Sequence, residues 1–514
     1  MHAATPHLTQ VHGLNGSGRA PAALSLEVGQ AASAADDAHT TKNALPPRSA
    51  HTVTVPGAAA GWCDAQAAWG SLPLATVLAP AIQLAQHGFP VSEITANSWT
   101  AQGDLLRAAN GVHLAPGAVD GAPFSGEGAV CPGHAQCPFL RADGSTPATG
   151  DIMQNMDLAD TFRSLGQQGA AAFYTGRIAD SILQAVQERG GVMQAEDLAT
   201  HSSTRVQPLS VKFHGVSVHE IPPNGQGIVA LMALQYMQYM QWPDGKQPAH
   251  NSPLYINALV QALRLAFADG RAHVSDETCA QVTPEQMLSD AYASERAALI
   301  QPHKQMPVPE GGWPIACSDT VSFQTVDGAG NAVSFINSNY MGFGTGIVPK
   351  GTGFTLQNRG AGFSLEAGHP NALAPGKRPY HTIIPGMVTQ GGSLFATFSV
   401  MGGFMQPQGH AQVVSNMVAY SMDAQSALDA ARVCLPAGSA DSPLAVEDGI
   451  PLEALQELLP EAHLVKSWER SVFGRGQIIR RLATGVLQGG SDGRGDGCAA
   501  GCGPASIRQP SSVE

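Results

Sequence analysis

The sequence of 514 residues lacks the patterns that define several common classes of protein. It contains no apolar run close to the roughly 18–20 residues that a membrane-spanning helix needs. Basic residues are in the minority, with 27 Lys and Arg against 40 Asp and Glu, and the net charge of −13 argues against binding to nucleic acid or anionic lipid. We therefore expect a small-molecule substrate, with no nucleic acid and no membrane as partner.

Patterns for metals, nucleotides and redox pairs are also missing. The eight cysteines are scattered and form no Cys-x-x-Cys pair, which favours free thiols in a reducing compartment. The glycine string at 222–227 lacks the Lys-Ser/Thr ending of a phosphate-binding loop, so we interpret it as tight packing of a strand on a helix. His369, His381 and His410 do not show the paired spacing of a helical zinc site. We expect no cofactor and no metal.

What the chain does contain is typical of a globular enzyme with a single α/β core. Hydrophobic residues make up 43% of the sequence, and 58 Gly with 36 Pro indicate many turns. Periodicity predicts helices and a half-buried strand, whereas composition predicts an irregular loop and a surface connector. The expected helices are 58–69, 74–87, 160–189, 228–239, 255–269, 284–299 and 410–431, the strand is 206–221, further strands dominate from 318 to about 400, the loop is 22–50 and the connector is 111–151.

The stretch from Ser318 to Ile336 is the centre of the sequence. Two apolar, β-branched runs flank the turn Asp-Gly-Ala-Gly-Asn at 327–331, which predicts a β-hairpin. Thr320 follows an acidic residue and opens the first strand in mid-chain.

At Thr320 the sequence resembles the γ-glutamyltransferase family of N-terminal-nucleophile hydrolases. The resemblance covers most of the chain, and its strings occur in the order expected for the family. They are Val55–Trp62, Ile221–Gly227, Thr320–Gly346, Gly353–Ser364, Pro375–Thr382, Met401–Gly403, Phe473–Gln477 and Gly489–Asp492. The resemblance implies an α/β fold, the four-layer αββα sandwich of these hydrolases. It also implies a missing opening helix and strand, so we expect the sandwich to be incomplete at its N-terminus.

The resemblance further implies that the precursor cuts itself between Asp319 and Thr320. Residues 1–319 would then form a large segment and residues 320–514 a small one, joined as a heterodimer that can oligomerise further. We interpret 301–315 as the flexible tail of the first fragment. The new α-amine of Thr320, with an unperturbed pKa near ~8, would activate its own hydroxyl.

Other site residues are assigned by their place in the family's motifs. Ser338 corresponds to the hydroxyl that hydrogen-bonds the nucleophile, and Gly402 with Gly403 corresponds to the oxyanion hole, where glycine permits close approach of the backbone. Arg19 is the candidate for gripping a substrate carboxylate, because a guanidinium binds a carboxylate with two hydrogen bonds. A solvated surface arginine is the alternative.

The substrate-binding positions depart from the family pattern. Tyr340 and Gly362 stand where transferases have the asparagine and aspartate that hold the α-ammonium of a γ-glutamyl group. His381-Thr382 replaces a pair of serines, and Arg359 follows Asn358. An unpaired ammonium in a closed pocket costs several kcal/mol, so the change argues against ordinary glutathione binding. It favours an acyl group that carries a carboxylate without a neighbouring amine, as in the oxamate amidohydrolase-like branch.

We therefore predict a self-processing amidohydrolase that forms an acyl-threonine with a small carboxylate-bearing amide. A conventional glutathione hydrolase or γ-glutamyl transferase, and a non-catalytic descendant, stay as alternatives. The start of the chain has no leader pattern, which favours the cytoplasm. A leader lost with the missing opening elements would instead make the protein periplasmic or secreted.

Overall fold

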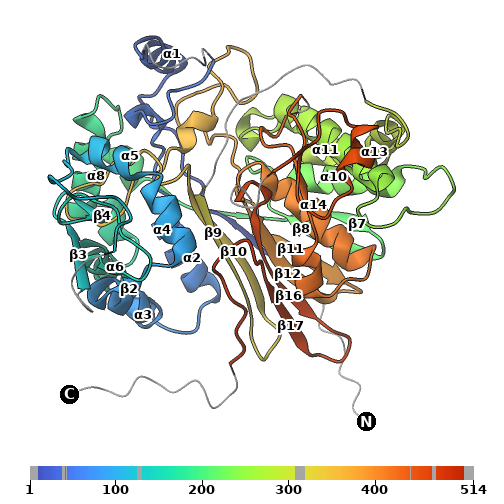
Figure 1. The fold of residues 1–514 in the computed structure, drawn as a ribbon. Helices are drawn as coiled ribbons and strands as arrows, with labels where there is room; N and C mark the ends of the chain where they lie inside the picture. The colour runs from blue at the N-terminus through green and yellow to red at the C-terminus, as the bar shows by residue number, and fades with distance from the viewer. Residues whose placement is uncertain are drawn as a thin grey trace.

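The computed structural model describes residues 10–36, 41, 43–123, 130–306, 319–439, 441–465 and 471–502. Figure 1 shows two groups of elements with one long hairpin between them. One group comes from the first part of the chain, and the other is built on a six-stranded sheet. No helix within the described ranges is both long enough and apolar enough to cross a membrane. The described residues also hold no cluster of three or more potential metal ligands.

The six-stranded sheet combines strands from both sides of Thr320. Its order is β17-β16-β12-β11-β8-β7, and neighbouring strands are antiparallel. The strands are β7 (Leu209–Phe213), β8 (Val216–Glu220), β11 (Gly386–Gln390), β12 (Ser393–Met401), β16 (Arg475–Arg481) and β17 (Leu487–Ser491). Because β8 pairs with β11, the segments before and after Thr320 share one hydrogen-bonded ladder.

Helices cover one face of this sheet and form the largest core with it. Every residue of α10 from Gly227 to Met237 is buried, since this helix is apolar on all sides and packs between the sheet and other helices. The helices of this part are α10 (Gly227–Tyr239), α11 (Pro253–His273), α12 (Pro284–Met287), α13 (Asp290–Ala297), α14 (Met405–Val418), α15 (Ala424–Asp429) and α16 (Leu452–Gln456), with a small sheet of β13 (Val433–Cys434), β14 (Ala445–Val446) and β15 (His463–Leu464).

The expected hairpin is confirmed as β9 (Asp319–Val326) and β10 (Ala332–Tyr340). Asp327 Oδ1 accepts hydrogen bonds from the N–H groups of Ala329 and Asn331, which closes the turn. The hairpin packs on β12 (Figure 1), where Gln324 Nε2 donates to Ser399 Oγ over 2.7 Å. Strand β9, which contains Thr320, is therefore fixed against the large sheet.

The remaining elements pack around three smaller hydrophobic cores. They are β1 (Gly13–Asn15), α1 (Leu26–Ala34), α2 (Ala58–Trp69), α3 (Leu74–His87), β2 (Phe89–Pro90), α4 (Glu93–Thr100), α5 (Gly103–Asn110), β3 (Val130–His134), β4 (Cys137–Arg141), β5 (Ile152–Gln154), α6 (Met156–Gln168), α7 (Ala171–Tyr174), α8 (Arg177–Gln187), α9 (Ala195–Ala199) and β6 (Thr204–Val206). The predicted helices 58–69 and 74–87 are confirmed, and Gly88 ends the second of them at φ 97°.

Several sequence-based expectations were wrong in detail. Residues 22–50 contain α1, because Ser25 caps it by accepting from the N–H of Val28. The connector 111–151 contains β3 and β4, and the single strand at 206–221 is a hairpin that turns at His214 and Gly215, both with positive φ. The helix 160–189 is broken at Gly169 and Gly176, and the helix 284–299 is broken near Ser289, which caps α13. The part from 341 to 385 is irregular apart from a 3-10 turn (Arg359–Gly362) and isolated bridges, because its many glycines and prolines favour turns over ladders. In the expected tail 301–315, residues 307–315 lie outside the described ranges.

Candidate active site

Thr320 lies directly opposite Ser338 in the β9–β10 ladder. Its hydroxyl donates to Ser338 Oγ over 3.1 Å. Residues facing each other across antiparallel strands have their side chains on the same face, so the register alone brings the two hydroxyls together. In the uncut chain Thr320 is buried, with 6% of its surface exposed.

Tyr340 adopts an unusual backbone conformation at the end of β10. Its φ is +80°, in the left-handed region that favours glycine, and the ladder register shifts between Ser338 and Tyr340. Its N–H donates to Ser338 Oγ over 2.9 Å. The Tyr340 ring is buried, and the guanidinium of Arg359 lies over it with Cζ 4.9 Å from the ring centroid.

Arg359 is a buried cation with incomplete hydrogen bonding. Its side chain donates from Nη1 to Thr382 Oγ1 over 2.7 Å, whereas Nε and Nη2 have no acceptor among the described residues. Burial lowers the pKa of the Arg359 guanidinium to about 9, and burial raises the pKa of Tyr340 to about 12. This guanidinium therefore keeps its positive charge at neutral pH while two of its nitrogens lack an acceptor among the described residues.

His381 is held mainly through its own backbone groups. The N–H of His381 donates to the carbonyl of Asn224, and its carbonyl accepts from the N–H of Gln226, each over 2.9 Å. Burial, and then the charges of Arg359 and Arg378, hold the pKa of His381 well below its ordinary value, so its imidazole is neutral near pH 7.

The amide of Asn358 is engaged with the main chain. Its Oδ1 accepts from the N–H of Met341, and its Nδ2 donates to the carbonyl of Pro47. The side chain therefore ties the segment that carries Arg359 to Met341, next to Tyr340, and to the segment around Pro47.

Gly402 and Gly403 form the turn between β12 and α14, with φ values of 141° and 59°. The carbonyl of Gly403 accepts from Gln226 Nε2 over 2.8 Å, and the same nitrogen donates to the carbonyl of Thr382 over 2.6 Å. A continuous series of contacts therefore links Thr320 to the glycine turn through Ser338, Tyr340, Arg359, Thr382 and Gln226.

Gln226 is a site residue that sequence reasoning missed. Its signal was present, because it lies in the glycine string at 222–227 that we interpreted as packing. It is fully buried, and its Oε1 accepts from the hydroxyl of Tyr380 over 3.1 Å. A buried amide with several hydrogen bonds positions its neighbours accurately.

Arg19 lies at an ion pair whose partner the sequence did not predict. Its Nη1 is 3.2 Å from Asp276 Oδ2 and 3.1 Å from the carbonyl of Gly376, while 42% of the side chain is exposed. Asp276 is buried, yet the N–H groups of Arg378 and Thr278 hold its pKa below the ordinary value. A carboxylate-binding role for Arg19 stays a prediction.

A hydroxyl at the start of a strand, hydrogen-bonded to a second hydroxyl and connected to a glycine turn and a buried guanidinium, fits the class of N-terminal-nucleophile hydrolases. Within this class, the chain belongs to the gamma-glutamyltranspeptidase family, whose model matches residues 2–502. It is thus an enzyme, a hydrolase or transpeptidase of that family, which sets aside the non-catalytic alternative.

Individual relatives cover nearly the whole chain. The glutathione hydrolase-like YwrD proenzyme of Bacillus subtilis is 32% identical over 470 residues, which are 90% of this chain and 84% of that protein. The oxamate amidohydrolase proenzyme of Klebsiella pneumoniae is 29% identical and covers 87% of this chain and 81% of its own length. The crystal structure of a cephalosporin acylase from Bacillus halodurans superposes with a TM-score of 0.81 at 40% identity, over 95% of this chain and 84% of the other. The proenzyme relatives imply self-cleavage into two chains.

Proposed function

We propose that the enzyme cleaves itself between Asp319 and Thr320 and then hydrolyses small amides whose acyl group carries a carboxylate. Residues 1–319 and 320–514 would be the two fragments. Their association after cleavage is supported by the β8–β11 ladder, which joins one fragment to the other. The same proposal includes the four-layer αββα sandwich that we expect for this class.

In the proposed reaction, the free α-amine of Thr320 takes the proton of the Thr320 hydroxyl, and Oγ1 attacks the amide carbon. The C–N bond breaks, the amine leaves with that proton, and an acyl-threonine ester forms. Water then attacks the ester, which releases the carboxylic acid and restores the hydroxyl. Ser338 orients Oγ1, and the N–H groups of Gly402 and Gly403 stabilise the oxyanion.

The preference for a carboxylate is carried by one observation, the two unpartnered nitrogens of Arg359. Among the described residues no carboxylate is paired with this buried guanidinium. A planar donor pair of this kind binds a carboxylate with two parallel hydrogen bonds. Its contacts through Tyr340 to Ser338 connect this donor pair to the Thr320 hydroxyl.

A γ-glutamyl group would bring an α-ammonium to the same cation. The positions where transferases neutralise that ammonium hold Tyr340 and Gly362, and neither has an acidic side chain. His381 is neutral and cannot compensate an ammonium. We therefore infer that the enzyme prefers acyl groups without the α-amine.

Three p-nitroanilides test the proposal because their acyl groups differ by one group each. Glutaryl-p-nitroanilide carries the carboxylate, γ-glutamyl-p-nitroanilide adds the α-ammonium, and pentanoyl-p-nitroanilide carries neither. We expect mass spectrometry to show cleavage before Thr320, and we expect kcat/KM to be highest for the glutaryl compound. A higher value for γ-glutamyl-p-nitroanilide would overturn the preference and favour a conventional glutathione hydrolase. Oxamate in the same assay, followed by ammonia release, tests a shorter acyl group.

A further inference from the structure

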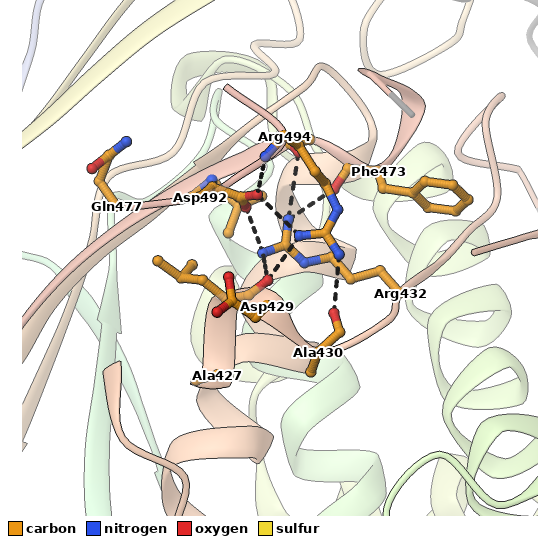
Figure 2. A network of polar contacts seen from close by, with 12 residues as sticks. Ala427, Asp429, Ala430, Arg432, Phe473, Gln477, Asp492 and Arg494 are labelled. Atoms are coloured by element: carbon orange, nitrogen blue, oxygen red, sulfur yellow. Dashed lines mark hydrogen bonds and ion pairs between the residues drawn. The ribbon is translucent and has the colours of Figure 1, made fainter. Parts of the chain in front are cut away.

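Four charged side chains are buried together behind the glycine turn. They are Arg432, Glu447, Asp492 and Arg494, and none of them is more than 8% exposed. Figure 2 shows Arg432, Asp492 and Arg494 gathered beside Phe473. Two guanidiniums and two carboxylates balance in charge, so the group can stay ionised in the interior.

The ion pairs within this charged cluster are direct. Arg432 Nη2 is 2.7 Å from Asp492 Oδ2, and Arg494 Nη1 is 3.0 Å from Asp492 Oδ1. Arg494 also donates from Nε to Glu447 Oε1 over 2.8 Å. Although burial opposes its ionisation, the charges of Arg432 and Arg494 hold the pKa of Asp492 below the ordinary value.

Stability alone is a poor explanation for such a cluster. Removing two ion pairs from water costs several kcal/mol per ion, and well-packed apolar residues often stabilise a core equally well. Ionic side chains differ from apolar ones because their hydrogen bonds fix backbone groups in definite directions. The backbone groups that the cluster binds therefore indicate its role.

The Arg432–Asp492 pair holds the backbone turn at 473–476 from both ends. Arg432 Nη1 donates to the carbonyl of Phe473 over 3.0 Å. Asp492 Oδ2 accepts from the N–H of Gly476 over 2.8 Å, and the N–H of Asp492 donates to the carbonyl of Gly476 over 3.1 Å. The turn cannot shift without breaking contacts to one of the two charged side chains.

This turn packs directly on the glycines of the candidate oxyanion hole. A Cβ atom on Gly402 would lie 3.1 Å from Gly474 Cα, and a Cβ atom on Gly474 would lie 2.5 Å from the carbonyl oxygen of Met401. Met401 also pairs with Arg475 in the β12–β16 ladder. The backbones of the two turns are thus in contact with no room between them, so a displacement at Gly474 moves Gly402.

We propose that Arg432 and Asp492 are positioning residues for catalysis, which hold the Gly402–Gly403 turn in shape through the turn at 473–476. The inference rests on the proposed function, because it takes the amides of Gly402 and Gly403 as oxyanion donors. It adds that their direction depends on an ion pair that touches neither Thr320 nor the substrate. Loss of the pair then slows acylation while substrate binding at Arg359 is kept.

The test compares Asp492→Asn with Asp151→Asn in the full self-cleaving enzyme. Asp151 is a matched control, because it also forms a buried pair with an arginine, Arg141, in the other group of elements. Acylation is followed as the burst of p-nitrophenol from p-nitrophenyl acetate, in which Thr320 Oγ1 takes the acetyl group and its proton ends on the leaving p-nitrophenol. This ester has no carboxylate, so its burst does not depend on Arg359. Rates are expressed per cleaved chain, counted by mass spectrometry.

We expect Asp492→Asn to slow the burst about 10- to 100-fold, because misplacing or losing one oxyanion donor has effects of this order. The KM for glutaryl-p-nitroanilide should stay within threefold. Asp151→Asn should lower the melting temperature to a similar extent and leave the burst rate within twofold. A burst of wild-type rate in Asp492→Asn, or an equal slowing in Asp151→Asn, would overturn the positioning role.

Arg432→Lys covers the case in which Asp492→Asn does not fold. The lysine keeps a positive charge beside Asp492, but it cannot also reach the carbonyl of Phe473. The burst should therefore slow, and a burst at the wild-type rate would overturn the proposal. A wild-type enzyme that releases the burst but hydrolyses no carboxylate-bearing amide would refute the proposed substrate and leave the positioning test in force. A wild type without any burst would refute both.

Discussion

Replacing Arg359 by methionine should stabilise the protein and at the same time damage substrate binding. Burial lowers the pKa of this guanidinium from its usual range above 12 to about 9. At 1.36 kcal/mol per pKa unit, such a displacement corresponds to a cost of roughly 4–5 kcal/mol for holding the charge in the interior, as an upper bound. This cost to the free energy of unfolding depends on pH. It is fully present below pH 9, where Arg359 is charged in both the folded and the unfolded chain, and it decreases as the pH rises above 9.

The favourable contacts of Arg359 offset part of this cost. The hydrogen bond to Thr382 contributes about 1 kcal/mol, and the stacking on Tyr340 contributes up to about 2 kcal/mol. Arg359→Met fills a similar volume without the charge, so the net effect on the free energy of unfolding should be a gain of roughly 1–3 kcal/mol. In the cleaved enzyme the loss of a charge-assisted carboxylate contact of about 3 kcal/mol should raise KM for glutaryl-p-nitroanilide roughly 100-fold or more.

Urea unfolding in a Thr320→Ala background measures the stability of one uncut chain and avoids the two-fragment equilibrium. Arg432→Met in the same background is the matched control, because it removes another buried guanidinium but takes from the buried Asp492 Oδ2 its ionic partner, leaving it only the N–H of Gly476. That control should lose about 3–5 kcal/mol. Arg359→Met that is less stable than its parent, or that keeps the wild-type KM, would refute the account of Arg359 as an unpaired ligand-binding cation.

Four further outcomes are expected. On denaturing electrophoresis, Thr320→Ala should run as one band, whereas the wild type should give two fragments produced by cleavage of the Asp319–Thr320 bond. A wild type that stays intact would contradict the proposed self-cleavage. Ser338→Ala should lower kcat about 10- to 100-fold, whereas Ser338→Thr, which keeps the hydroxyl, should stay within a few-fold in the same p-nitroanilide assay. The kcat/KM for the glutaryl compound should fall as the pH rises through about 9, because Arg359 then loses its charge, and a profile of Arg359→Met with the same alkaline decline would argue against this cause. Gly402→Ala should abolish hydrolysis, since the new methyl would meet the neighbouring turn at 3.1 Å on a backbone with φ 141°; full activity would show that the turn is not part of the site.

The turn residues predicted the hairpin, and the family resemblance predicted the nearness of Thr320 to Ser338. The structure shows that both depend on local rules. A five-residue turn with Asp, Gly and Asn sets the register of two strands, and the register places these two hydroxyls face to face. The helices 58–69 and 74–87 were predictable for a similar reason, since their apolar spacing and the glycine after the second one are local signals.

Other features escaped prediction even though their signals are local. The helix α1 and the hairpin of β7 and β8 depend on a cap and a turn that composition alone does not reveal. Residues 111–151 look like a connector because they are rich in glycine and proline, yet they contain β3 and β4, which pair with each other, and β3 also pairs with β5 just after this range. Pairing between distant strands overrides local preference in such segments.

The sequence by itself determined which chemical groups are available: a threonine at the head of a strand, a second hydroxyl, paired glycines, and an arginine directly after Asn358. Only the tertiary structure decided which of these groups have hydrogen-bond or ion-pair partners. Arg19 and Arg359 are both arginines in family-like strings, but Arg19 pairs with Asp276 while Arg359 keeps two nitrogens without an acceptor among the described residues. The difference arises because hydrogen bonds and burial depend on spatial neighbours. Asp276 is more than 200 residues away from Arg19 along the chain, and no local sequence pattern shows that it will lie beside this arginine or that Arg359 will lack a similar partner.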